Sequence, residues 1–479
     1  MKADSQTDNS PPTGTLVVGQ TSQGVEIRGS VLRLTRHQII FEMYNPAALL
    51  AMSEVLSDFK IVVENQHVYS GRAVISHVMH TGTVTICEAS LEEFWIDIDF
   101  LTTTADPAGL RQQFDHFMQG WHKTYKVSAE YKVVIADMQT FLMDLRQWLD
   151  QVELGVRSSP SGSRIDLERE LIKAISQPIL ACIDGLFDRF EKVAGEIEKD
   201  LQPAHWNYMR RQLHSLVLGS PFAYRTFSKP LGYAGDYEMV DMMNREPYEG
   251  STLFAKVLNV WFLDQVPARA HRNRIVHLSQ KILEEVLRVR PQKRPARVYN
   301  LGCGPAVEIQ QFLTKNELSN AVEFTLADFN DEALQHLRDV FETMKRNRGL
   351  SPIVQLQKRS VHQILKEAAR TIDLPAEKKF DLVYCAGLFD YLPDAICQRL
   401  MNIFYSWLAP GGLLLATNVD ASNPIRNGME HLLDWHLIYR NSKQVQSFKP
   451  QQAPPELFSV VAEPTGVNLL IEARKSGHA

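Results

Sequence analysis

The chain has 479 residues, of which 44% are hydrophobic and 22% are charged, and its formal net charge at pH 7 is −5. A chain of this length exceeds what one hydrophobic core supports, so we expect two or three domains. The acidic balance, without a long lysine or arginine run, excludes a basic surface for nucleic acid, and no apolar run reaches the roughly 18 residues of a transmembrane helix.

The first segment, residues 1–14, is polar and contains two adjacent prolines, which predicts a disordered, flexible tail. It lacks the apolar core of a signal peptide, and we therefore expect a cytoplasmic protein. The five cysteines are scattered and show neither Cys-x-x-Cys nor the histidine spacing of a zinc site. This pattern predicts reduced thiols and no metal.

Residues 15–105 predict a small β-barrel or meander, because short alternating runs are separated by turn residues. The five predicted strands are residues 24–28, 38–42, 60–63, 71–75 and 83–86. The pattern resembles PilZ-type barrels that bind cyclic di-GMP through an Arg-x-x-x-Arg arm and an Asp/Asn-x-Ser-x-x-Gly motif. Neither motif is intact, since Arg33 and Arg36 are one residue too close. We therefore predict a degenerate PilZ-like barrel with a docking or oligomer role, which would suit a homodimer.

Residues 106–204 predict a helical region with a linker inside it. A hydrophobic stripe with steps of three and four residues favours a bundle core or dimer seam. The stripe consists of Ile135, Met138, Phe141, Leu142, Leu145, Trp148, Leu149 and Val152. Residues 155–163 are rich in glycine, serine and proline and predict the linker. A second helix is predicted over residues 165–201, and Pro178 should kink or interrupt it.

Residues 205–273 predict a cap that precedes the next domain. Within it, the segment around Gly232 and Gly235 has an unusual density of aromatic residues. The glycines can act as hinges, while Tyr233 offers an apolar ring with a hydroxyl group. Such a segment suits a lid over a cofactor, and a tight ordered turn is the alternative.

The most informative feature of the chain is the apolar strand Val298–Leu301, which runs into a Gly-x-Gly turn and then a helix. Gly302 and Gly304 can adopt backbone angles closed to other residues, and the helix that follows offers unpaired N–H groups. Val307 stands where a dinucleotide fingerprint needs its third glycine, which disfavours NAD and FAD. Roughly 20 residues later a second strand ends in Asp328, the place for a ribose-binding acid, with a helix cap as the alternative.

Further strands alternate with helical stretches, which predicts an α/β fold with a parallel sheet. They are residues 353–356, 380–385 and 408–417, followed by a final hairpin at 458–462 and 467–472. The glycine loop, the ribose acid, the Phe-Asp-Leu-Val strand and the Leu-x-Pro-Gly-Gly turn resemble the class I S-adenosylmethionine (SAM)-dependent methyltransferases over about residues 274–475. This resemblance implies a Rossmann-like, seven-stranded sheet with one antiparallel strand in a domain over residues 274–479, and SAM as the cofactor.

The resemblance also implies cofactor-binding residues. Gly302, Cys303 and Gly304 would line the methionine end of SAM, Asp328 would hold the ribose hydroxyls, and Ser360 and Val361 would flank the adenine. Three residues at the end of the strand at 380–385, namely Cys385, Ala386 and Gly387, would face the sulfonium. Further cofactor contacts are implied for Asn300, Phe329, Tyr233 and Asp236.

Three segments are similar to bacterial methyltransferases that make 3-hydroxypalmitate or 3-hydroxymyristate methyl esters as quorum-sensing signals. They are residues 229–238 (KPLGYAGDYE), 386–392 (AGLFDYL) and 435–440 (WHLIYR). The resemblance implies methylation of a 3-hydroxy fatty acid, either free or carried on acyl carrier protein or coenzyme A. The alternatives are an O- or N-methyltransferase of another small molecule, and a signalling or scaffold protein whose barrel reads a nucleotide.

A carboxylate acceptor needs no general base, because it is already ionised at pH 7. The enzyme would then need hydrogen-bond donors that orient the carboxylate, and the candidates for this catalytic role are Tyr233, Tyr391, Arg426 and His431. The candidate substrate contacts are Phe389, Trp435 and Arg440, and Arg440 is also a candidate donor. His431 and Trp435 are four residues apart and are predicted to share one helix face. Packing of that pair against the core is the alternative.

Overall fold

The computed structural model describes residues 15–35, 37–43, 50–63, 66–80, 84–91, 127–158, 164–349, 352–370 and 374–477, together with residues 111, 114, 115 and 118. The predicted tail, residues 1–14, lies outside this set. The chain divides into two compact units, and neither is continuous in sequence. The first, here the barrel unit, contains residues 1–234, 248–261 and 425–436; the second, the sheet unit, contains residues 235–247, 262–424 and 437–479. The predicted boundaries at 105, 204 and 273 stay predictions.

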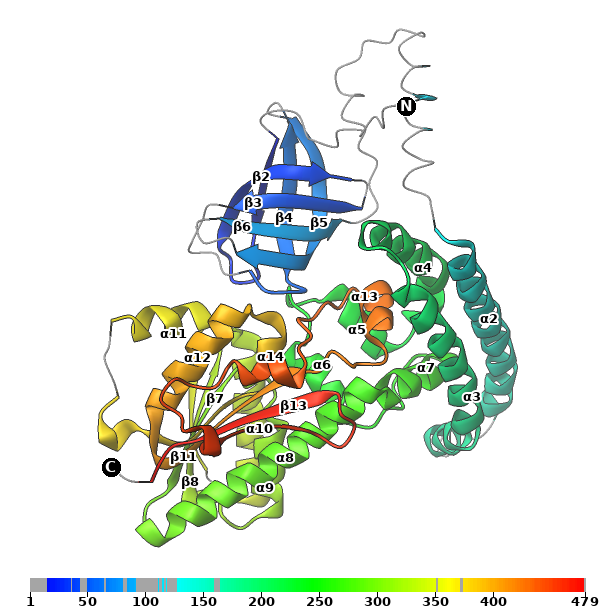
Figure 1. Cartoon of the computed structure of the whole chain (residues 1–479). Coiled ribbons are helices and arrows are strands. Elements are labelled where there is room, and N and C mark those ends of the chain that lie inside the picture. Colours follow the sequence, from blue (N-terminus) through cyan, green and yellow to red (C-terminus); the bar gives the residue numbers. More distant parts are fainter. Residues whose placement is uncertain are drawn as a thin grey trace. The chain divides into compact units, whose positions relative to one another are not determined.

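The barrel unit begins with a closed antiparallel barrel of strand order β1-β2-β3-β6-β5-β4 (Figure 1). The strands are β1 Leu16–Gln20, β2 Glu26–Leu34, β3 Gln38–Met43, β4 Val55–Val63, β5 Gln66–His80 and β6 Thr85–Leu91. Side chains alternate between the barrel interior and the outside, and Phe41, Phe59 and Ile61 are completely buried. The predicted barrel is confirmed, but it has one more strand than expected, because β1 pairs with both β2 and β4 and closes it. A relationship to PilZ barrels stays a prediction.

Helices complete the barrel unit. They are α2 Ala129–Arg157, α3 Arg164–Gly195, η3 Lys199–Leu201, α4 Gln202–Val217, α5 Pro221–Ser228, α7 Leu253–Asp264 and α13 Arg426–Leu433. Helix α2 begins after Ser128, whose side chain accepts a hydrogen bond from the Tyr131 N–H, and it packs against α3. The predicted stripe on α2 is buried at five positions, but Trp148 is 49% exposed. Pro178 lies inside α3, which continues through it, so the predicted interruption does not occur.

Helix α13 belongs to the barrel unit although it lies more than 200 residues after α4 in the chain, and Figure 1 shows it in orange among green helices. Its first N–H groups, from Asn427 and Gly428, donate to the carboxylate of Glu191 on α3. At its other end, Arg210 donates to the carbonyls of Glu430 and His431. These side chains satisfy the backbone groups that a helix leaves unpaired at its termini.

The sheet unit contains a seven-stranded sheet of order β12-β13-β11-β10-β7-β8-β9. Its strands are β7 Ala296–Leu301, β8 Val322–Asp328, β9 Ile353–Lys358, β10 Phe380–Cys385, β11 Leu408–Val419, β12 Phe458–Ala462 and β13 Asn468–Arg474. Strand β13 is antiparallel to both of its neighbours, while β7 to β11 pair in parallel. The Rossmann-like sheet with one antiparallel strand is confirmed.

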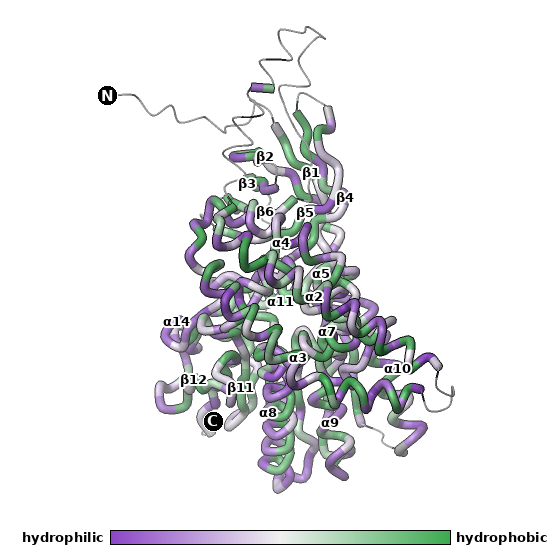
Figure 2. Tube along the Cα trace, turned by 90° about the vertical axis from the view of Figure 1, so that its right-hand side faces the viewer, coloured by the Kyte–Doolittle hydropathy of each residue, from purple (hydrophilic) through white to green (hydrophobic). Residues whose placement is uncertain are grey.

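Helices and short 3-10 turns connect these strands. They are α6 Tyr237–Met242, α8 Val266–Val289, η4 Arg290–Gln292, α9 Val307–Lys315, η5 Ser319–Ala321, α10 Asp331–Arg348, α11 Val361–Ala368, η6 Ala376–Lys378, η7 Phe389–Tyr391, α12 Asp394–Trp407, α14 Ser442–Gln446 and η8 Pro455–Leu457. Figure 2 shows hydrophobic and hydrophilic residues interleaved along α8, and one side of that helix contributes Leu278, Ile282 and Val286 to the core of the sheet unit.

Two further properties concern the whole described chain. All five cysteines are free; Cys182 is exposed and the other four are buried. Within the described ranges, the helices are too short or too polar for any of them to cross a lipid bilayer.

Candidate active site

The glycine loop after β7 presents its backbone to open space. Gly302 and Gly304 have φ values of +67° and +49°, a region that favours glycine. Among the described residues, a Cβ added at Gly304 would meet no atom within 4 Å, and one at Gly302 would meet only Leu388, at 3.9 Å. The glycines are therefore required by their backbone angles, and the space beside them is free for a ligand to approach the main chain.

Asp328 connects the end of β8 to this loop. Its carboxylate accepts hydrogen bonds from the Gly304 N–H at 3.1 Å and the Asn330 N–H at 3.0 Å. The side chain is 6% exposed, and burial raises the pKa of Asp328 while the two backbone bonds oppose the rise. The helix-cap alternative does not hold, because Asn330 caps α10. A carboxylate held by two N–H groups keeps further lone pairs for hydroxyl donors.

A buried polar cluster lies behind the glycine loop. Glu308, in the first turn of α9, accepts a hydrogen bond from the Tyr384 hydroxyl at 2.7 Å and one from the Asn300 amide at 3.3 Å. Burial raises the pKa of Glu308, with the Tyr384 bond opposing the rise. The buried Asn300 Oδ1 has no hydrogen-bond partner within the described part of the chain. The cluster links the ends of β7, β10 and α9.

A second cluster surrounds Gly387, just after β10. The Gly387 N–H donates to Thr417 Oγ1 at 2.9 Å, and a Cβ at Gly387 would stand 3.2 Å from the Arg274 guanidinium. Arg274 Nη2 lies 2.6 Å from His271 Nδ1, which fixes that nitrogen as the acceptor and leaves the proton of a neutral ring on Nε2. Burial, followed by the charge of Arg274, holds the pKa of His271 well below its usual range. Arg274 is 8% exposed, and its buried Nε has no partner among the described residues.

Buried hydrogen bonds and ring packing hold the segment that contains Phe389 and Asp390. Asp390 accepts from the Val419 N–H at 2.6 Å, and Phe389 is completely buried with its ring centroid 6.0 Å from that of Phe448. Arg440 is 1% exposed and donates to the carbonyls of Phe389 and Leu392 and to Asn418 and Asp394. The predicted substrate contacts Phe389 and Arg440 thus have structural partners.

Gly235, a predicted hinge, and Tyr391, a predicted catalytic residue, lie next to each other in the sheet unit. A Cβ at Gly235, where φ is +77°, would lie 2.7 Å from the Tyr391 hydroxyl, so the glycine allows this close approach. Asp236 is 2% exposed and caps α6 by accepting from the Met239 N–H. Ser360 likewise caps α11, which begins at Val361, through a capping box with Gln363. Cofactor contact by Asp236 and Ser360 stays a prediction.

Four predicted residues, Tyr233, Arg426, His431 and Trp435, lie in the barrel unit, whereas Cys303, Phe329, Cys385 and Ala386 lie in the sheet unit. His431 is completely buried, and its Nδ1 lies 2.9 Å from the Tyr131 hydroxyl. Arg426 forms an ion pair with Glu430 one turn further along α13.

The predicted helical pairing of His431 with Trp435 is wrong. Helix α13 ends at Leu433, and Asp434 turns the chain with φ at +53° before Trp435. The aromatic rings of Phe190 and Trp206 pack around His431 instead, as in the alternative of core packing.

Sequence reasoning missed several polar groups of this site. Arg274 has no local signal, because it lies on a helix about 30 residues before the glycine loop. Glu308 follows the loop directly, and Thr417 and Tyr384 interrupt otherwise apolar strands. A polar residue inside a buried strand needs a partner, and that signal could have identified both.

Comparison with known proteins gives one match to a described domain. Residues 271–453 match a family described as a methyltransferase domain. No curated protein matches the chain.

Three solved structures resemble parts of the chain. A possible exported protein from Bordetella parapertussis is 17% identical, over 53% of this chain and 86% of that one, with a TM-score of 0.39. The magnesium protoporphyrin IX methyltransferase ChlM from Synechocystis PCC 6803, with bound SAH, is 9% identical over 44% and 88%, with a TM-score of 0.31. The S-adenosylmethionine-dependent methyltransferase SibL in its apo form is 17% identical over 73% and 96%, with a TM-score of 0.34. With TM-scores this low, the three likenesses add nothing to the domain match.

Residues 271–453 therefore form a methyltransferase domain, and all of this range except residues 425–436 lies in the sheet unit. The domain match agrees with the strand order and supports SAM as the cofactor.

Proposed function

We propose that the chain is a SAM-dependent carboxyl O-methyltransferase that transfers the methyl group of SAM to the carboxylate of a 3-hydroxy fatty acid and so makes the methyl ester, a quorum-sensing signal. A thioester-linked acid would first be hydrolysed, which releases the thiol carrier and the carboxylate. The methyltransferase domain at residues 271–453 supports the methyl transfer. The resemblance of residues 229–238, 386–392 and 435–440 to 3-hydroxy fatty acid methyl ester synthases supports the substrate class.

The described residues fit SAM chemically. The open backbone at Gly302 and Gly304 would receive the methionine end, and the spare lone pairs of Asp328 would accept the ribose hydroxyls. The unpartnered Nε of Arg274, noted above among the described residues, would donate to a carboxylate. When bound, SAM supplies an electrophilic methyl group on a sulfonium.

The observation that carries the carboxylate acceptor is the state of His271. Its Nδ1 is occupied by Arg274, and its low pKa keeps the ring neutral, so this histidine cannot take a proton from an alcohol or phenol through either nitrogen. Asp390 and Glu308 are already engaged in buried hydrogen bonds. A carboxylate acceptor, which is ionised at neutral pH, needs no such base. The residues then have only to orient the acceptor and exclude water.

The acyl chain would bind by hydrophobic burial, which contributes about 0.8 kcal/mol per methylene. A preferred chain length should therefore appear as a steep rise in kcat/KM with each added methylene, up to the length that the site accommodates.

The test is incubation of the purified chain with methyl-deuterated SAM and a series of 3-hydroxy fatty acids of graded length, free and thioester-linked. We expect mass spectrometry to detect a labelled methyl ester at one preferred length, and Asp328→Ala to abolish it. If labelled products form only from alcohols or amines, the proposal is wrong and the chain is an O- or N-methyltransferase of another small molecule. SAM binding without any labelled product would favour the signalling or scaffold alternative.

A further inference from the structure

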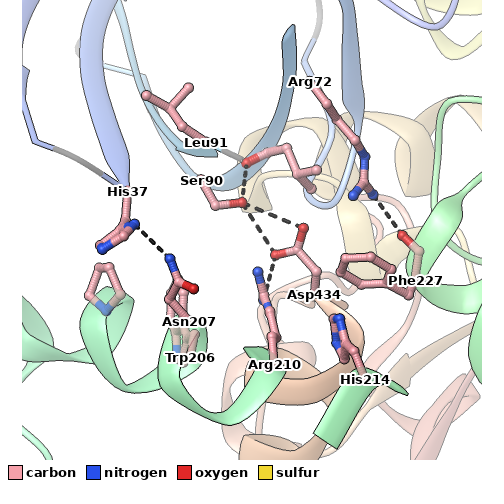
Figure 3. Close-up of a pocket in the computed structure, with 12 residues that line it drawn as sticks. His37, Arg72, Ser90, Leu91, Trp206, Asn207, Arg210, His214, Phe227 and Asp434 are labelled. Carbon is pink, nitrogen blue, oxygen red and sulfur yellow. Dashed lines mark hydrogen bonds and ion pairs between the residues drawn. The ribbon is translucent and has the colours of Figure 1, made fainter. Parts of the chain in front are cut away.

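The barrel unit contains a cavity of about 140 Å³ where the barrel meets α4, α5 and the end of α13. Its lining comes from both kinds of structure: His37, Arg72, Val74, Ser90 and Leu91 from the barrel side, and Pro203, Trp206, Asn207, Arg210, His214, Phe227 and Asp434 from the helical side. Figure 3 shows Ser90, Arg210 and Asp434 joined at the centre, with the His37–Asn207 pair on one side and Arg72 bound to the Phe227 carbonyl on the other. The volume is close to that of a cavity that admits a small organic molecule, which is about 150 Å³.

The charges around the cavity do not balance. The charged lining residues are Arg72, Arg210 and Asp434, and the amino group of the buried Lys229 stands 3.9 Å from the Asp434 carboxylate. Burial lowers the pKa of Lys229 from 10.5 to about 7, so it contributes part of a positive charge at neutral pH. Asp434 accepts from Arg210 at 2.9 Å, and His436 Nε2 lies 3.1 Å from it. Among the described lining residues, one carboxylate therefore faces the basic side chains of Arg72 and Arg210 and the nearby Lys229, and Asp434 is already engaged by its hydrogen bonds. Surplus positive charge in a partly buried cavity favours an anion.

Two residues that line the cavity each carry a buried hydrogen-bond donor that lacks an acceptor among the described residues. The buried Arg72 Nε has no partner among the described residues, although its Nη2 donates to the Phe227 carbonyl at 2.6 Å. The indole Nε1 of Trp206, a residue only 6% exposed, is likewise buried without an acceptor in the described part of the chain. Buried donors are normally satisfied, so both point to a missing group rich in oxygen acceptors.

We propose that this cavity binds a phosphate group, either as inorganic phosphate or as the end of a phosphomonoester. The guanidinium of Arg72 presents a planar fork that suits phosphate oxygens, and Trp206 adds a neutral donor. A phosphate carries about −1.5 to −2 charges at pH 7, which matches a surplus of up to two positive charges better than a carboxylate would. The cavity lies in the barrel unit, to which Asp434 belongs although it falls within the matched range 271–453, and the proposal does not depend on the proposed reaction.

The test is calorimetric titration of the full chain with inorganic phosphate, with sodium chloride at equal ionic strength as the reference. We expect binding at one site with a Kd of about 1 mM or lower. Arg72→Gln should weaken phosphate binding at least about tenfold, because the charged fork of hydrogen-bond donors is lost. The affinity of Arg72→Lys should lie between those of the unchanged chain and Arg72→Gln. Arg28→Gln is the matched control, since Arg28 is an arginine of the same barrel with a side chain 78% exposed.

A second variant keeps the test independent of Arg72. Trp206→Phe retains an aromatic ring and removes the unpartnered N–H, and it should weaken phosphate binding about fivefold if circular dichroism shows a native fold. Titration with glycerol 3-phosphate distinguishes a phosphomonoester, which should bind more tightly, from inorganic phosphate. Equal affinity for acetate, no heat with phosphate, or unchanged binding in folded Arg72→Gln and Trp206→Phe would overturn the proposal.

Discussion

The two units each bury an aspartate, but they hold it in opposite ways. In the barrel unit, burial alone would raise the pKa of Asp434, yet Arg210, Lys229 and His436 outweigh that effect and hold the pKa well below its usual range. In the sheet unit, burial raises the pKa of Asp328, which receives backbone N–H groups rather than cations. A carboxylate surrounded by basic side chains uses its lone pairs within the fold and stabilises it. One held by backbone amides remains available to hydroxyl donors, as ligand binding requires.

The largest loss of stability should come from removing the negative charge of Asp434 in the barrel unit. Asp434→Asn leaves Arg210 and Lys229 buried without their anion, and we expect a loss of about 3–5 kcal/mol in the free energy of unfolding in urea. Because the folded pKa is depressed, the contribution of Asp434 is present above its unfolded value near pH 3.8 and is lost as pH falls through the folded value. Glu26→Gln, which removes an exposed ion pair with Arg28, should cost far less.

Removing the carboxylate of Asp328 in the sheet unit should weaken SAM binding rather than lower the stability of the fold. Asp328→Ala would remove the proposed bonds to the two ribose hydroxyls, and we expect SAM affinity to fall roughly 100-fold by calorimetry. Its control is Asp331→Ala, which removes a side chain that is 71% exposed at the start of the next helix. If a folded Asp328→Ala protein binds SAM with native affinity, Asp328 does not bind the ribose, and the functional difference proposed between the two aspartates is wrong.

Arg274→Lys tests the other ligand-facing group of the sheet unit. Lysine keeps the charge but loses the fork, and we expect about a tenfold loss in one kinetic constant. A weaker SAM affinity would assign Arg274 to the methionine carboxylate, whereas a higher KM for the acceptor would assign it to the fatty acid. No change in either constant would make Arg274 a purely structural residue.

His214 in the barrel unit should produce a pH-dependent effect. Burial lowers its pKa from 6.5 to about 4, with the bond to the Leu432 carbonyl opposing the shift. Between these values the unfolded chain binds the extra proton, so this contribution to stability is present above pH 6.5 and is lost as pH falls toward 4. His214→Gln should flatten the decline of the urea midpoint over this range, and an unchanged slope would contradict the assignment.

The smallest effect is expected for Tyr233→Phe, at the barrel-unit end of the segment that leads to Gly235. If the hydroxyl orients the acceptor, turnover should fall about fivefold with SAM affinity unchanged. Equal turnover in single-turnover assays would exclude the Tyr233 hydroxyl from the reaction.

Local pattern predicted the sheet well and the site only in part. Strand alternation and the glycine loop depend on neighbouring residues, so β7, β8 and β10 were found within two residues of their ends. The first barrel strand was missed although it begins with the apolar run Leu16–Val18, because that run is too short to be assigned without its pairing to β2 and β4. Pro178 was expected to kink or interrupt a helix; the interruption does not occur, and α3 packs against α2 and α13.

Whether a polar residue is available for function depends on contacts between distant parts of the chain, which local pattern does not show. Arg440 has the side chain of a substrate-binding residue, yet four partners within the fold occupy its guanidinium. Arg274 has no motif, and only the structure brings it beside Gly387. A residue type can suggest a role, but its hydrogen-bond partners decide whether it is available for that role.

The position of α13 has a consequence for synthesis of the chain. Glu191, Arg210 and His214 all bind α13, which a ribosome adds more than 200 residues after those partners. The nascent barrel unit therefore carries unmatched charges and an open apolar core until most of the methyltransferase domain has been translated. For the same reason, an expression fragment that stops before residue 425 would lack a piece of its own interior, and the two units cannot be separated by a single cut.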